Sequence, residues 1–244
     1  MNKKVIFIFI FKDFLIIKLN NMISNSIIEE RYQFIINLYL ISKKSKLDFL
    51  YNIDFRHNIF NKYMPSIKLS RTDDDIHIAV TKWYNNPIIS EKKYGNIRDW
   101  DTSRVTNMYR LFCSHFFYNK PSPDISKWDV SNVTNMKECF HFTNFNGYIG
   151  NWNTRNVITM EGMFNGSVKF NGDISRWNVK NVLDMKNMFR LTEFNKYITN
   201  WEITNLQNTE NMFYGVRKMN KNVIKWNLNN IKNKKDMFRG TICH

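Results

Sequence analysis

The sequence has little of what a disulfide scaffold, a metal centre or a membrane span requires. Its 244 residues include three cysteines, Cys113, Cys139 and Cys243, too few for a disulfide framework. No pair of them has the spacing of metal ligands. The apolar run from Val5 to Phe11 is too short for a transmembrane helix, which needs about 20 apolar residues. We therefore expect no metal, no cofactor and no membrane-spanning segment.

Patterns typical of catalysis are also missing. No Ser/His/Asp arrangement, carboxylate pair or glycine-rich phosphate loop stands out in the chain. The histidines are scattered and are interpreted as surface or loop residues: His57, His77, His115, His141 and His244. Cys139 is expected to be a buried thiol. The sequence thus favours a protein without enzymatic activity.

What the sequence does have is a tryptophan that returns at nearly constant intervals. The steps between successive members are 28, 24, 25, 24 and 25 residues for Trp100, Trp128, Trp152, Trp177, Trp201 and Trp226. A period of this length is typical of a solenoid, in which each repeat is one small unit that buries its apolar face against its neighbours.

Other apolar residues keep the same register. An aliphatic residue lies three before and another five after each tryptophan, Met is frequent eight and eleven after, and twelve after there is always Phe: Phe112, Phe140, Phe164, Phe189, Phe213 and Phe238. We expect these positions to stack into columns that form one continuous core. Phe140, Phe164, Phe189 and Phe213 in particular should be buried.

Asparagine forms a polar column four residues after each tryptophan. It comprises Asn132, Asn156, Asn181, Asn205 and Asn230. An amide between stacked turns can pair with backbone groups that would otherwise be unsatisfied, so this column is predicted to be structural. The position directly after each tryptophan changes from Asp101 and Asp129 to Asn153 and Asn178. This change favours turn formation over a calcium site, which would keep its carboxylates.

Each repeat can be divided into expected elements. The β-branched and aromatic residues of 125–130 predict a short strand, and the spacing of Val133, Met136, Cys139 and Phe140 predicts a short helix. The predicted fold is an α/β repeat solenoid of the leucine-rich-repeat type. It has six strand–turn–short-helix repeats of about 24–25 residues over residues 97–241. A cap helix is predicted over residues 74–86, after three aspartates and before Pro87.

The residues before the cap do not repeat. We expect a small helical region of unknown role in residues 1–71 and the capped solenoid in residues 72–244. Lys12 and Asp13 interrupt the N-terminal apolar run and no small-residue cleavage pattern follows it, so we expect neither a cleaved signal peptide nor an anchor. Translation starting at Met22 is an open alternative.

The repeats resemble a known family. The segments Tyr94–Met108 and Trp128–Met136, the latter reading Trp-Asp-Val-Ser-Asn-Val-Thr-Asn-Met, are similar to BspA-like leucine-rich-repeat surface proteins. They are most similar to the mycoplasma-lipoprotein-type repeat of unknown function. The resemblance covers residues 75–241 and implies a leucine-rich-repeat-like solenoid with no catalytic residues. Bacterial members of this family are mostly surface proteins, and other members occur in large DNA viruses and protists.

Charge gives the other functional indication. The formal net charge is +15, and Asn, Ile and Lys are abundant, as in an AT-rich coding sequence. Basic residues gather in the last turn and form a candidate interaction patch: Arg217, Lys218, Lys221, Lys225, Lys232, Lys234, Lys235 and Arg239. Such a patch could attract nucleic acid or an acidic partner. A polar terminal repeat explains it equally well.

We therefore expect a scaffold that binds a protein partner, acts inside a cell and is encoded by a large DNA virus. One alternative is a surface or secreted adhesin, which requires export. Another is binding of nucleic acid or an acidic partner through the basic last turn. Nucleic-acid binding is the less favoured, because the aromatic residues are committed to the core and are not available for stacking on bases.

Overall fold

The computed structural model describes residues 69–113, 122–219 and 226–242. The chain divides into two units, Met1–Ile67 and Lys68–His244, and all described residues belong to the second. The predicted N-terminal helical region therefore lies outside the described residues. The boundary predicted at residues 71 and 72 stays a prediction.

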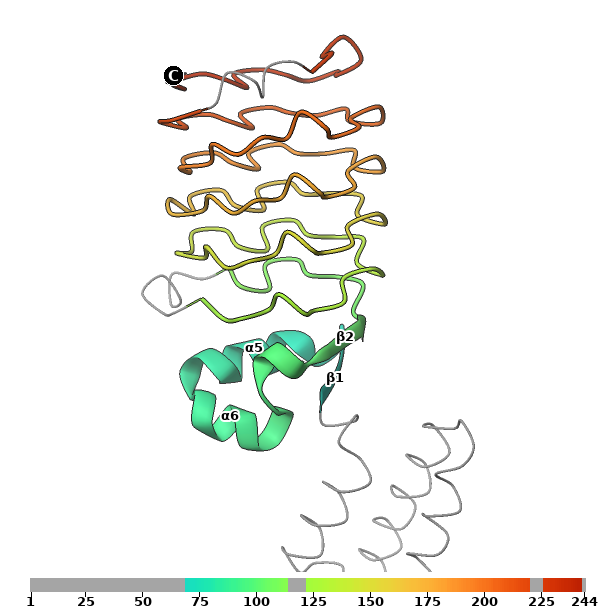
Figure 1. Cartoon of the computed structure of the whole chain (residues 1–244), viewed down its shortest axis with the longest axis vertical. Coiled ribbons are helices and arrows are strands. Elements are labelled where there is room, and N and C mark those ends of the chain that lie inside the picture. The colour runs from blue at the N-terminus through green and yellow to red at the C-terminus, as the bar shows by residue number, and fades with distance from the viewer. Residues whose placement is uncertain (1–68, 114–121, 220–225, 243–244) are drawn as a thin grey trace, which may run out of the picture. The chain divides into compact units, whose positions relative to one another are not determined.

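From Trp100 onward the described chain winds into coils that stack on one another (Figure 1). One residue of each coil, seven after its tryptophan, forms a parallel β-bridge with its counterpart in the next coil. This bridge column consists of Asn107, Asn135, Thr159, Asp184, Asn208 and Asn233. The repeat in the sequence thus corresponds to a repeat in backbone pairing.

Apart from the strand Asp101–Arg104 in the first coil, turns and single bridges stand where each described coil was predicted to have a strand and a short helix. In the segment expected to be helical, alternate N–H groups point along the stack: Met136 donates to the carbonyl of Thr159 (3.0 Å) and Phe140 to that of Met163 (2.8 Å). The N–H of Cys139 instead closes a tight turn on the carbonyl of Met136. An α-helix would require every N–H to bond four residues back, so pairing between coils replaces the helix.

A left-handed residue in every coil explains why the helix cannot form. The position ten after each tryptophan has φ between 53° and 60°, at Arg110, Glu138, Gly162, Asn187, Asn211 and Asp236. Such values are unfavourable for L-residues and interrupt a right-handed helix. Five of the six residues are not glycine, so composition gives almost no sign of this conformation.

Aromatic columns form the core. Phe140, Phe164, Phe189 and Phe213 are fully buried, as predicted. Their rings stack from coil to coil, with centroids 5.5 Å apart between Phe140 and Phe164 and 5.9 Å apart between Phe164 and Phe189. The tryptophans are also buried. The periodic apolar positions therefore share one core, and each coil contributes one layer.

Polar groups of the repeats pair between coils. The indole N–H of Trp128 donates to the carbonyl of Ile97, in the preceding coil (2.8 Å), and that of Trp177 donates to the carbonyl of Ile149 (3.0 Å). The asparagine column does the same with its amides, as when Asn181 Nδ2 donates to the carbonyl of Arg155 (2.8 Å). The predicted structural role of this column is confirmed for Asn132, Asn156, Asn181 and Asn205.

In the part of the chain that the structure describes, two helices precede the coils. Helix α5, Ile76–Asn85, lies within the range predicted for a cap helix, and α6, Pro87–Tyr94, begins at the proline expected to end the first helix. Strand β1, Ser70–Thr72, pairs in parallel with β2, Asp101–Arg104, and a 3₁₀ turn, Ile97–Asp99, separates α6 from β2. Buried residues of α5 join the core, and the Tyr84 ring meets Phe112 edge-on at 6.3 Å.

Asp73 completes the first coil. In later coils the N–H six residues after the tryptophan donates to a carbonyl of the preceding coil, as Thr134 does to Thr106 (2.9 Å). Thr106 itself has no preceding coil, and its N–H donates to Asp73 Oδ1 (2.8 Å), as does that of Asn107 (3.0 Å). The carboxylate therefore stands where the carbonyl of an earlier coil would be.

Replacing Asp73 with alanine should lower the free energy of unfolding by roughly 1 kcal/mol, since two end N–H groups lose their acceptor. Partial burial raises the pKa of Asp73, but hydrogen bonds from Thr106 and Asn107 outweigh it and leave the pKa below its usual value. A lowered pKa gives stability that is present above about pH 4 and is lost as the pH falls through the folded-state pKa.

Urea melts at pH 7 and at acidic pH would test this. Asp73→Asn, which keeps one oxygen acceptor, should lose less stability than Asp73→Ala at pH 7. The difference between wild type and Asp73→Ala should shrink as the pH falls. Equal stabilities at pH 7 would show that Asp73 does not cap the stack.

Candidate functional site

The basic residues of the last turn are exposed wherever they are described. Arg217, Lys218, Lys232, Lys234, Lys235 and Arg239 are solvent-exposed, whereas Lys221 and Lys225 lie outside the described residues. Three of the side chains bind groups of the protein itself. Lys232 Nζ donates to Gln207 Oε1 (3.0 Å), Lys234 Nζ donates to the carbonyl of Leu228 (3.2 Å), and Arg239 pairs with Asp236 (3.7 Å). These contacts suit a polar end to the stack as well as a binding patch.

A strip of exposed side chains runs along the coils beside the bridge column. This exposed strip is the position six after each tryptophan: Thr106, Thr134, Ile158, Leu183, Gln207 and Lys232. Its backbone is paired from coil to coil, as when Leu183 N–H donates to the carbonyl of Ile158 (2.8 Å). Ile158 and Leu183 are 44% and 39% exposed. The strip therefore has two adjacent apolar side chains with polar neighbours at both ends.

Ion pairs occupy the position nine after the tryptophan. Lys137 Nζ lies 2.6 Å from Glu161 Oε2, and Lys186 Nζ lies 3.0 Å from Glu210 Oε2, so the sign of the charge alternates along the stack. The hydrogen bond from Lys186 lowers the pKa of Glu210, and the bond to Glu161 raises the pKa of Lys137. These pairs are partly exposed, so they fix the register of the coils more than they add stability.

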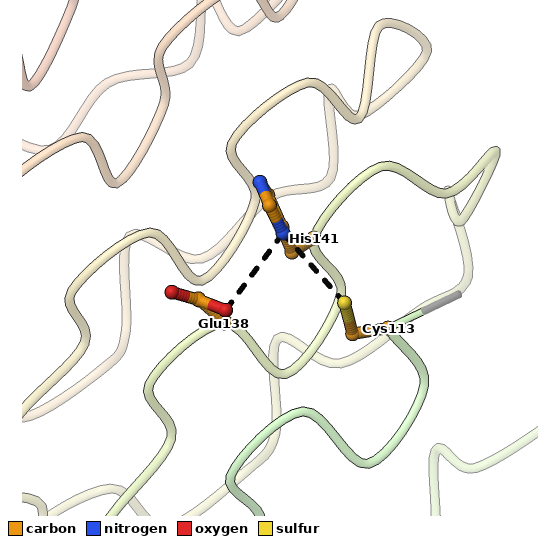
Figure 2. A group of neighbouring side chains, drawn as sticks. All are labelled: Cys113, Glu138 and His141. Atoms are coloured by element: carbon orange, nitrogen blue, oxygen red, sulfur yellow. Dashed lines mark hydrogen bonds and ion pairs between the residues drawn. The ribbon is translucent and has the colours of Figure 1, made fainter. Parts of the chain in front are cut away.

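One cluster combines three residues with metal-binding groups. Cys113 Sγ lies 3.6 Å from His141 Nδ1, and the same nitrogen lies 3.8 Å from Glu138 Oε2. The sulfur, the nitrogen and a carboxylate oxygen all lie within 4.8 Å of one another, and all three residues are half-buried. Figure 2 shows the imidazole between the thiol and the carboxylate.

Two further residues contact this cluster. Arg110 Nε lies 3.3 Å from Glu138 Oε2 and 3.4 Å from Cys113 Sγ, and the contact with the sulfur raises the pKa of Arg110. On the other side of the imidazole, Asn165 Nδ2 lies 3.2 Å from His141 Nε2, while Asn165 Oδ1 is buried with no hydrogen-bond partner. The histidine is thus contacted through both ring nitrogens.

The cluster was not predicted, although the repeat register contains it. Cys113, His141 and Asn165 all lie thirteen residues after their tryptophans, and Arg110 and Glu138 lie ten after theirs. Because a shared offset means neighbouring positions in consecutive coils, aligning the repeats would have brought these residues together. Spacing along the chain alone suggested that His141 was a surface or loop residue, and the structure places it in a turn, half-buried beside Cys113 and Glu138.

Cys139 differs from Cys113 although it belongs to the same pair of coils. It is fully buried among core residues, as the sequence predicted, and burial raises the pKa of its thiol. A buried thiol of this kind is unreactive. The chemistry of this region therefore belongs to Cys113 rather than to Cys139.

No helix in the described ranges is both long and apolar enough to cross a membrane. Comparison with curated proteins gives no match, and neither does comparison with solved structures. The family described as "Mycoplasma protein of unknown function, DUF285" matches twice, at residues 83–190 and 139–243. Together these matches span the coils, helix α6 and the end of α5, more than half of the 244 residues. The chain belongs to this family, the DUF285 family.

Proposed function

We propose that the protein is a non-enzymatic interaction scaffold whose coils form a leucine-rich-repeat-like solenoid and whose exposed strip binds another protein. The finer relationship to BspA-like surface proteins, carried by the Trp-Asp-Val-Ser-Asn-Val-Thr-Asn-Met pattern of Trp128–Met136, is part of this proposal. Solenoids offer extended surfaces of this kind because every repeat contributes one position to each column.

The observation that supports this proposal most is the pair Ile158 and Leu183 in the exposed strip. An apolar centre with polar residues around it is the usual composition of a protein interface. Here Thr134 precedes the apolar pair and Gln207 follows it. The backbone pairing between coils fixes the main chain at these positions, so little backbone conformational entropy is lost on binding.

Affinity capture from the native host tests the proposal with paired variants. Ile158→Asp/Leu183→Asp should lose the captured partner, because it places two charges at the centre of the strip. Tyr148→Asp/Tyr197→Asp is the matched control, because these two tyrosines are also exposed but belong to the position four before the tryptophan. Both variants should melt within a few degrees of wild type. Equal capture by the strip variant and wild type would contradict the proposal.

Exposed basic residues of the last turn support a second candidate, which is binding of nucleic acid or an acidic partner. We expect only weak binding that salt removes. Labelled DNA and RNA should be titrated at about 150 mM salt, with Lys225→Glu/Lys232→Glu/Lys235→Glu alongside. Sub-micromolar binding that this variant abolishes would favour the second candidate. The adhesin alternative depends on residues 1–68, which lie outside the described residues.

A further inference from the structure

We propose that Cys113, Glu138 and His141 form a zinc-binding site near the N-terminal end of the coil stack. The ligands would be the Cys113 thiolate, one Glu138 carboxylate oxygen and His141 Nδ1. This site is separate from the exposed strip, and the proposal does not depend on the function proposed above.

The distances between the ligand atoms suit a tetrahedral ion. Zinc binds sulfur at about 2.3 Å and nitrogen or oxygen at about 2.0–2.2 Å. At a tetrahedral angle these lengths place sulfur and nitrogen about 3.6 Å apart, and nitrogen and oxygen about 3.4 Å apart. The corresponding separations in the protein are 3.6 Å between Cys113 Sγ and His141 Nδ1, and 3.8 Å between His141 Nδ1 and Glu138 Oε2. The third pair, Cys113 Sγ and the Glu138 oxygen, lies within 4.8 Å, so binding one ion requires the Glu138 carboxylate to move toward the other two ligand atoms.

Asn165 provides the support that a zinc-binding histidine usually has. Such histidines donate their second ring N–H to an oxygen, which leaves the first nitrogen free to bind the metal. Asn165 Oδ1 is buried without a partner, while its Nδ2 lies 3.2 Å from His141 Nε2. A half-turn of the side-chain amide exchanges its oxygen and nitrogen atoms. The oxygen then faces His141 Nε2 and accepts a hydrogen bond from Nε2–H. His141 Nδ1 then carries its lone pair toward Cys113 and Glu138.

Arg110 lies against two of the three proposed ligands. Its Nε atom lies 3.3 Å from Glu138 Oε2 and 3.4 Å from Cys113 Sγ. The Arg110 side chain is 52% exposed, so it can rotate into solvent when an ion arrives. Binding therefore replaces the single positive charge of Arg110 with the two positive charges of the ion, and Arg110 competes with the metal.

The ligand set selects the kind of metal. A thiolate with an imidazole favours zinc over magnesium or calcium, which prefer ligand sets made of oxygen alone. Three protein ligands leave a fourth position for water or for a ligand from another molecule. Because the three residues are only half-buried, an ion can reach the site from solvent.

The test uses cobalt(II) as the probe, because cobalt(II) binds at zinc sites and its complexes absorb light. Titration of the purified full-length protein should produce the near-ultraviolet charge-transfer band of a cobalt–thiolate bond, and zinc should displace it. Cys113→Ser should abolish the band and His141→Gln should weaken cobalt binding at least about tenfold. Matched controls are Cys243→Ser and His77→Gln, which change the same residue types elsewhere and should leave binding unchanged.

Two further variants separate a built site from binding to a reactive thiol. Arg110→Gln removes the competing cation and should tighten zinc binding several-fold. Asn165→Ala removes the support of His141 and should weaken binding about tenfold. Thermal melts of each variant without metal would establish that it is folded. Absence of the cobalt–thiolate band in wild type, its persistence in Cys113→Ser, or unchanged affinity in both Arg110→Gln and Asn165→Ala would overturn the proposal.

Discussion

Phe189→Ala should lower the free energy of unfolding by roughly 3–5 kcal/mol, the usual cost of truncating a buried aromatic residue. The Phe189 side chain is fully buried. Its ring centroid lies 4.1 Å from that of Phe194 and 5.5 Å from that of Phe213 in the next coil. Because the ring joins layers on both sides, the cavity left by alanine would weaken two interfaces between coils at once.

Urea melts followed by tryptophan fluorescence measure this change. Phe238→Ala is the matched control, because Phe238 occupies the equivalent position in the last coil. Phe238 stacks on Phe213 but is only half-buried. It should cost clearly less than Phe189→Ala. A loss below about 1 kcal/mol for Phe189→Ala would show that the aromatic columns are not the main source of stability.

The aromatic columns could be predicted from the sequence because a buried position keeps the same kind of side chain in every coil. A position that must fill the same space in every coil receives Trp, Phe or Met each time, and the interval between them reveals the repeat. The asparagine column could be interpreted for a similar reason. An amide that pairs with the backbone of the preceding coil, as Asn181 does with Arg155, is needed once in every coil.

The course of the backbone within a coil was harder to predict. The spacing of Val133, Met136 and Phe140 is that of a helical face, yet these side chains reach the core from a chain of turns. Periodicity shows which residues face inward but not how the backbone carries them there. The decisive position, ten after the tryptophan, is left-handed at Glu138 and Asn187 although neither is glycine. Pairing with the next coil stabilises this conformation, and local sequence carries little information about such pairing.

Three residues, Asp73, Cys113 and His141, show the limit of sequence-based prediction in another way. Asp73 lies outside the repeat, and its role depends on the N–H groups that the first coil leaves without an earlier partner. Cys113 and His141 lie inside the repeat, but at a position where the residue type varies from coil to coil. None of these three residues belongs to a column in which the same kind of residue recurs, and such recurrence is what made the core predictable. Aligning the coils in space brings Cys113 and His141 together where the spacing along the chain does not.

Ile76→Ala in the cap helix α5 should lower the free energy of unfolding by about 2–5 kcal/mol. Ile76 is fully buried, whereas Ile78 on the same helix is 53% exposed, so Ile78→Ala makes the same chemical change with an expected effect within about 0.5 kcal/mol. Alanine has the higher helix propensity, and any loss at Ile76 therefore reports packing against the coils rather than a weaker helix.

The two ends of the stack should respond differently to the loss of the cap. Each coil contacts only its neighbours, so damage at α5 should loosen the first coils before the later ones. Hydrogen exchange of wild type and Ile76→Ala measures this gradient. The N–H of Met108, bonded to Asn135, should lose more protection than that of Met185, bonded to Asn208. Equal loss of protection at both sites would mean that the coils unfold as one cooperative unit. Equal stability of Ile76→Ala and Ile78→Ala would mean that α5 does not seal the core.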